Sequence, residues 1–355
     1  MARRAGGLVP AAYCILYQQV TEVVTEQRSH QQVPYDLRAV FWLPDQPACP
    51  LQEPEALEVF SRRQGLLWAD ICAHDIASTA ELLIHRLGFH PLAVEDALSP
   101  YERPALQQYD GVLFLSAYTV QPADEEEAYA EIAFFVGEHF LVTVHAQPMP
   151  LLEHWLKQWE AHPAKIGKTS AHLLHLLLDA IVDEYFPVGD TLEEKADELE
   201  DAIFSGNGRV QVADILRVKR RLLELRQHIT PLRDVLNALL RRDVEIIPDE
   251  VVPYLQDVYD HALRIAELVD VNRDIIAGVL DAHLSVVSNR LNEVMRILTV
   301  ISTILMSAAL IAGIYGMNFI HMPELQWRAG YPFAGTLMVL VGVVEWYIFR
   351  RKGWI

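Results

Sequence analysis

The chain has 355 residues, more than one typical domain, of which 52% are hydrophobic and 22% charged. This composition excludes both a wholly membrane-embedded chain and a disordered one. The 29 basic and 48 acidic side chains leave a net charge of −19, which argues against nucleic acid as a partner, because Lys and Arg supply most of the affinity for phosphates. A chain this acidic is better suited to meeting cations.

Residues 1–165 show mixed strand and helix patterns and are expected to form an α/β domain. Runs rich in β-branched and aromatic residues predict five strands, at 39–43, 66–71, 112–120, 131–136 and 140–145. The last two are joined through Gly137 and Glu138, which predicts a hairpin. Helical periodicity appears at 79–87 and 91–98. The charge run at 124–127 is expected to be a solvated hairpin tip.

From residue 166 the strand signals cease, and only helices are expected. Residues 166–248 carry two amphipathic helices, at 171–204 and 210–242, with a Ser-Gly-Asn-Gly turn at 205–208. No proline occurs between Pro253 and Pro323. One helix is therefore predicted from about 252 to 316, roughly 95 Å long. Its part within 249–296 forms a stalk that is expected to pack against copies of itself.

Two apolar runs near the carboxyl end are each long enough to cross a membrane as a helix. Residues 297–320 carry no charge, and 331–349 carry only Glu345, whose role the sequence leaves open. We expect transmembrane helices at 297–317 and 331–350, an external loop at 318–330 and a basic tail at 351–355. Basic residues flank the two ends away from the loop, so the positive-inside rule places both termini, and the acidic first part of the chain, in the cytoplasm.

One face of the first apolar helix carries small, hydroxyl-bearing and methionine side chains at spacings of three or four. The stripe consists of Asn292, Met295, Thr299, Ser302, Met306, Ala309, Gly313 and Gly316. Such a stripe is found in ordinary transmembrane packing and along water-filled paths. The polar groups gather toward the cytoplasmic half, which favours the path.

The chemistry of this stripe suits a strongly hydrated divalent ion. It contains no carboxylate, and Mg²⁺ gives up its waters reluctantly, so oxygen dipoles can hold the hydrated ion. Met295 and Leu298, near the inner mouth, would form a hydrophobic constriction that gates by dewetting.

The segment that follows carries a recognisable signature. Tyr315-Gly316-Met317-Asn318-Phe319 is followed by the sequence MPEL at 322–325 and by RRKGW at 350–354. Together with HPLAVED at 90–96, DVYDH at 257–261 and SNRLNEVM at 288–295, these motifs resemble the CorA family of magnesium transporters over nearly the whole chain. The related ZntB-type zinc transporters usually differ in the middle of the Gly-Met-Asn triplet and lack the MPEL loop.

This resemblance implies a homopentamer in the inner membrane. Each subunit would contribute an α/β/α sandwich in the cytoplasm, a long helical stalk and two carboxyl-terminal transmembrane helices, of which the first lines the pore. The outer ring that captures the ion would comprise Gly316, Met317, Asn318 and Glu324. From the residues alone, the alternatives to this ring are a helix C-cap for Asn318 and a solvated loop residue for Glu324.

The resemblance also assigns the conduit and a regulatory site. The residues facing the conduit would be Asn292, Met295, Leu298, Thr299, Ser302, Thr303, Met306, Ala309, Leu310 and Gly313. Divalent ions would be held at Glu95, Asp96, Asp179, Asp257 and His261. Asp96 and Asp257 would meet between neighbouring subunits, so that cytosolic Mg²⁺ keeps the ring closed and its loss opens it.

The implied activity is uptake of Mg²⁺ driven by the membrane potential, without enzyme catalysis and without ATP. Two charges moving inward gain about 4.6 kcal/mol per 100 mV. The alternatives are a Zn²⁺, Co²⁺ or Ni²⁺ transporter of the same superfamily, or a scaffold anchored in the lipid bilayer. His172, His175, Asp179 and Asp183 share a helical face at metal-ligand spacing, a pattern also typical of packing residues. Gly167-Lys168-Thr169 lacks the first glycine of a phosphate-binding loop.

Overall fold

The computed structural model describes residues 34–99, 104–121, 128–205, 210–241, 246–318, 322–323 and 327–354. The charge run at 124–127 and most of the turn at 205–208 lie outside these ranges. The chain divides into two compact units, Met1–Glu198 with Leu216–Ile275 and Leu199–Ile215 with Ile276–Ile355. The two units are described separately below.

The first unit is built on a seven-stranded mixed sheet. Its strands are β1 (Tyr35–Trp42), β2 (Cys49–Leu51), β3 (Leu66–Ala73), β4 (Leu106–Tyr109), β5 (Val112–Gln121), β6 (Ala128–Val136) and β7 (Phe140–His145). They lie in the order β2-β1-β3-β7-β6-β5-β4, and β3 and β7 are parallel neighbours. The five predicted strands and the β6–β7 hairpin are confirmed.

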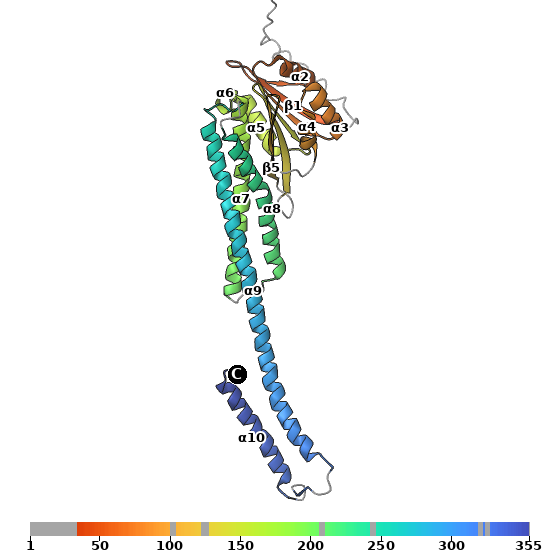
Figure 1. The fold of residues 1–355 in the computed structure, drawn as a ribbon, viewed down its shortest axis with the longest axis vertical. Helices are drawn as coiled ribbons and strands as arrows, with labels where there is room; N and C mark the ends of the chain where they lie inside the picture. The colour runs from red at the N-terminus through yellow and green to blue at the C-terminus, as the bar shows by residue number, and fades with distance from the viewer. Residues whose placement is uncertain are drawn as a thin grey trace, which may run out of the picture. The chain divides into compact units, whose positions relative to one another are not determined.

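Helices cover both faces of this sheet, because alternate side chains of each strand point to opposite faces. One face carries the short helices α2 (Glu53–Arg62), α3 (Ile76–Glu81), η1 (Leu82–Arg86) and α4 (Pro91–Leu98). There, Ile71 and Val144 of the sheet pack with Leu83 of η1 and Val94 of α4. On the other face, Trp68 packs against a tryptophan of α5 (Pro150–Ala161). The expected α/β/α sandwich is confirmed (Figure 1).

The longer helices agree with the sequence pattern. They are α7 (Ser170–Phe204), α8 (Val212–Leu239), α9 (Val252–Tyr315) and α10 (Gly330–Arg351); the short α6 (Pro163–Ile166) precedes them. The predicted uninterrupted helix is confirmed, since α9 runs for 64 residues. Pro253 stands at its second position, where a missing backbone N–H costs nothing.

In the second unit, α9 and α10 lie side by side. Both helices are long and apolar enough to cross a membrane, and their apolar windows are almost wholly exposed. The Oγ of Ser307 on α9 donates a hydrogen bond to Glu345 of α10, and the guanidinium of Arg296 donates to the carbonyl oxygen of Gly353. The two predicted apolar helices therefore form a packed hairpin.

Candidate functional site

One face of the apolar part of α9 is covered by α10. Val300 is buried, with an exposed fraction of 5%, and Ile304, Ser307 and Ile311 are half-buried. Ile304 approaches Gly342 of α10. We call this side of α9 the seam.

The stripe lies on a different side of α9, where side chains are exposed. Met295 and Met306 expose 59% and 71% of their surface, and the other exposed members are Asn292, Thr299, Ser302, Ala309 and Gly313. With about 100° of rotation per residue, the centre of the stripe lies about 120–150° from the seam. The hairpin therefore leaves the stripe uncovered.

The residues next to the stripe also have defined places. Leu298 and Leu310 are exposed, and Thr303 is half-buried between the stripe and the seam. A hollow of about 560 Å³ on this side of α9 is lined by Leu298, Thr299, Ser302, Thr303, Met306, Ser307 and Leu310.

The two threonine hydroxyls of this region direct their hydrogens into the helix. Thr299 Oγ1 donates to the carbonyl oxygen of Met295 at 2.7 Å, and Thr303 Oγ1 donates to that of Thr299 at 2.8 Å. The lone pairs of each hydroxyl oxygen remain available as acceptors. Acceptors of this kind can bind the hydrogens of water molecules around a cation without removing those waters.

The triplet Gly316-Met317-Asn318 follows directly after the end of α9. The backbone N–H of Gly316 donates to the carbonyl of Ala312 at 2.9 Å, and all three triplet residues are exposed. Asn318 is absent from the described residues that have a positive φ, so it is not a left-handed C-cap. Glu324, the fourth residue of the predicted ring, lies outside the described residues.

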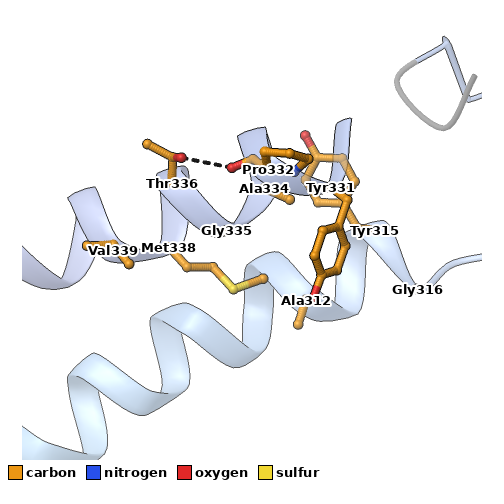
Figure 2. Close-up of a pocket in the computed structure, with 10 residues that line it drawn as sticks. All are labelled: Ala312, Tyr315, Gly316, Tyr331, Pro332, Ala334, Gly335, Thr336, Met338 and Val339. Atoms are coloured by element: carbon orange, nitrogen blue, oxygen red, sulfur yellow. Dashed lines mark hydrogen bonds between the residues drawn. The ribbon is translucent and has the colours of Figure 1, made fainter. Parts of the chain in front are cut away.

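A groove beside the triplet was not anticipated from the sequence. It has a volume of about 700 Å³ and lies between the carboxyl-terminal end of α9 and the amino-terminal end of α10, with Tyr315 and Gly316 on one side and Tyr331 and Gly335 on the other. Figure 2 shows Met338 extending from α10 toward α9 across this groove. The groove arises from small residues on two helices that are distant in sequence, so no local pattern marks it.

A second candidate site lies in the first unit, where α7 and α9 meet. Asp179 and Asp183 of α7 and His261 of α9 place one possible ligand atom each within 4.8 Å of one another. Among the described residues this is the one such group of three or more. Two carboxylates and one imidazole are a suitable ligand set for a divalent cation.

The electrostatics of this cluster favour a cation. Burial, and next the neighbouring Asp183, raise the pKa of the Asp179 carboxyl. A raised carboxyl pKa means that the negative charge is poorly compensated, which a bound cation would correct. The Nδ1 atom of His261 is buried and has no hydrogen-bond partner among the described residues, as expected of a nitrogen that is free to bind a metal.

The cluster contains only part of the predicted regulatory set. Asp179 and His261 are brought together, and Asp257 is exposed on α9 one turn before His261. Glu95 and Asp96 are on α4, outside the cluster, and are exposed and half-buried respectively.

The structure does not bring together the four residues His172, His175, Asp179 and Asp183 that share a face of α7. Asp179 and Asp183 join the cluster, whereas His172 contacts the hydroxyl of Thr169 at 2.8 Å. His175 packs against the ring of Tyr254, and burial lowers its pKa. Asp183 thus enters the cluster with His261, a combination that the sequence analysis missed because the two residues lie on different helices.

These features indicate a protein in which an α/β/α domain with an acidic cluster is joined to a hairpin of two helices that are long and apolar enough to cross a membrane. The model of the family "CorA-like Mg2+ transporter protein" matches residues 63–351. The chain belongs to the CorA family.

Individual relatives agree with this membership. The chain is 35% identical over 291 residues to the cobalt/magnesium transport protein CorA of Thermotoga maritima, covering 81% of this chain and 83% of that protein. It is 35% identical over 290 residues to the putative metal ion transporter YfjQ of Bacillus subtilis, covering 81% and 89%. The complete CorA structure from Methanocaldococcus jannaschii superposes with a TM-score of 0.76 at 24% identity, covering 90% and 98%, which shows the shared fold.

Proposed function

We propose that this CorA-family divalent cation transporter is a channel that takes up Mg²⁺, driven by the membrane potential. The observation that carries the proposal is the exposed stripe on α9, turned away from the α10 seam. A stripe of hydroxyls, small residues and methionines occurs in helix packing and along water-filled paths, and the gathering of its polar groups toward one half of the apolar span favours a water-filled path. Five copies of α9 arranged around an axis would provide one.

The assembly that we propose is a homopentamer in the inner membrane with both termini in the cytoplasm. The stripe residues would face the central path, and α10 would form the outer layer against lipid. The partners are therefore copies of this chain, lipid and the transported ion, with neither nucleic acid nor ATP involved. Each stripe position then appears five times around the path, which multiplies weak oxygen contacts.

Ion entry would occur at Gly316, Met317 and Asn318. The amide oxygen of the exposed Asn318 would accept hydrogen bonds from the waters of a hydrated ion, and Glu324 would add negative potential. Thr299 and Ser302 would continue the acceptor surface toward the cytoplasm, where Met295 and Leu298 would form the dewetting constriction.

Closure would follow from cytosolic Mg²⁺ bound in the soluble part. Asp179, Asp183 and His261 would hold one ion, as their mutual distances and the unpaired His261 nitrogen support. Asp96 and Asp257 would bridge neighbouring subunits, with Glu95 nearby. Carboxylates of two chains repel unless a cation lies between them, so loss of Mg²⁺ would separate the subunits.

One observation favours a transition metal, in place of Mg²⁺, as the transported ion. The imidazole of His261 in the cluster suits Co²⁺, Ni²⁺ or Zn²⁺ better than Mg²⁺, which prefers oxygen ligands. The same path would then carry a transition metal. A membrane-anchored scaffold is the remaining alternative, and it requires neither the triplet nor the stripe.

Ion flux into liposomes separates these proposals. The Asn318→Ala variant should lose most of its Mg²⁺ uptake while its assembly stays intact, and Asn237→Ala, an exposed asparagine on α8, should not. Unchanged uptake in Asn318→Ala would favour the scaffold. Competition by Co²⁺, Ni²⁺ and Zn²⁺ against Mg²⁺ in the same liposomes identifies the preferred ion.

A further inference from the structure

Glu345 is an acidic residue within the apolar helix α10, six residues before its last residue Arg351, and it has a specific partner. Its Oε1 atom accepts a hydrogen bond of 2.5 Å from the hydroxyl of Ser307 on α9. Its Oε2 atom is buried and has no hydrogen-bond partner among the described residues. Ionisable side chains within a membrane span are costly and are usually retained for a function.

The backbone geometry brings the two helices close together at this contact. Gly342 lies one turn before Glu345, and Ile304 lies one turn before Ser307. A Cβ atom built on Gly342 would be 3.6 Å from Cγ2 of Ile304, so the α10 backbone reaches the side chains of α9 directly. Small residues at membrane interfaces permit such approaches. The hydrogen bond therefore lies at a tightly packed crossing of α9 and α10.

This bond also restricts the rotations of α9 that keep Ser307 in contact with α10. Ser307 is adjacent in sequence to Met306, and the two side chains differ by about 100° around the helix. While Ser307 is held against α10, the stripe residues Met306 and Ser302 must point away from α10. Among the described residues, no other side chain–side chain hydrogen bond joins the apolar parts of α9 and α10. Apolar contacts alone are less directional, since they tolerate sliding and rotation.

We infer that Glu345 is a positioning residue for the ion path: through Ser307 it holds the rotational orientation of α9 that presents the stripe. The inference rests on the proposed function, because it requires the stripe to border water. Glu345 itself is not assigned to the path.

The test is the accessibility of single cysteines on α9 to a membrane-impermeant, positively charged methanethiosulfonate reagent, in the full-length protein in liposomes. Cysteines are introduced at Ser302 and Met306 on the stripe, and at Ile301 and Ala308 on other sides of α9. The protein without an added cysteine gives the background from the native thiols. In the parent protein the two stripe positions should react faster than the other two.

Glu345→Leu should reduce this difference in reactivity by about three- to eighteen-fold, the range that corresponds to measured interhelical hydrogen bonds. Ser307→Ala should have the same effect, and the double variant no more than either single one. Glu345→Gln, whose amide oxygen still accepts from Ser307, should restore the parent pattern. Thr336→Val is the matched control, because the Thr336 hydroxyl bonds within its own helix to the carbonyl of Pro332.

The outcomes distinguish the two ideas. If the parent protein reacts equally at all four positions, the stripe does not border water, and both the proposed function and the role of Glu345 are wrong. If the parent shows the stripe and Glu345→Leu leaves it unchanged, only the role of Glu345 is overturned. If Glu345→Gln fails to restore the pattern that Glu345→Leu has lost, the hydrogen bond is not the cause.

Discussion

Replacing Asp183 by asparagine tests whether the cluster of Asp179, Asp183 and His261 holds a divalent cation. The ligand atoms lie within 4.8 Å of one another. At an effective dielectric constant of about 20, two unit charges at that separation repel by about 3.5 kcal/mol. Because Asp183 is exposed, screening by water reduces the repulsion to about 1 kcal/mol.

Two opposite effects on stability are expected from Asp183→Asn. Without divalent ions the variant should be more stable than the parent by about 1 kcal/mol, since the repulsion with Asp179 is removed. With Mg²⁺ at one hundred times the parent dissociation constant, the parent gains about 2.7 kcal/mol. A tenfold loss of affinity in the variant would reduce that gain to about 1.4 kcal/mol. The order of the two stabilities therefore changes when Mg²⁺ is added.

The measurement is denaturant unfolding of the detergent-solubilised full-length protein, with a chelator and with Mg²⁺. Asp197→Asn is the control, because Asp197 is an exposed acid on the same helix and is outside the cluster. It changes the net charge equally. A Mg²⁺-dependent gain in Asp183→Asn equal to that of the parent would refute the assignment of a metal to this cluster.

Two further predictions concern the first unit. Burial lowers the pKa of His228 to about 4, and its ring lies against those of Tyr118 and Tyr129. The folded state therefore favours neutral His228, and the free energy of unfolding should fall as pH decreases from about 6.5 to about 4. His228→Phe should show less of this loss in urea unfolding at several pH values, and identical pH profiles for parent and variant would contradict the reasoning. The second prediction is that Gly65→Ala destabilises the protein by about 1–3 kcal/mol. Gly65 has a φ of 71°, and an added Cβ would lie 2.6 Å from the carbonyl oxygen of Trp42. Gly111→Ala, at a φ of 81° with open space around it, should cost less in the same unfolding measurement, and equal costs would exclude the clash as the cause.

The elements that the sequence predicted are those with a long, local pattern. The four long helices repeat their apolar positions over many turns, so α7 to α10 were predicted to within a few residues. The strands β2 and β4, of three and four residues, were missed. Both are edge strands of the sheet, and such short segments are extended because a neighbouring strand pairs with them. The predicted helix at 79–87 is divided into α3 and the π-helical turn η1, a change in hydrogen bonding that periodicity does not record.

The two candidate sites differ in the same way, since one follows from a local sequence pattern and the other depends on contacts between distant segments. The stripe belongs to one helix, so its common face follows from spacing alone, and the structure adds which side α10 covers. The cluster requires Asp183 and His261 from different helices, and nothing local in either segment indicates the other. Resemblance to the family supplied Asp179 and His261, while the contribution of Asp183 needed the packing of α7 against α9.

The proposed roles of the two sites, conduction for the stripe and regulation for the cluster, place different demands on how strongly each site holds an ion. An ion must leave a conducting path as readily as it enters, so the contacts along it have to be individually weak. The stripe contains no carboxylate, and the hydroxyl groups of its Thr299 and of the neighbouring Thr303 already donate their hydrogens to helix carbonyls. A regulatory ion must be held strongly enough to change the stability of the closed state, and the cluster supplies two carboxylates and an imidazole within 4.8 Å. Placing a carboxylate on the stripe, as in Ser302→Asp, would therefore be expected to trap the ion that the path has to release.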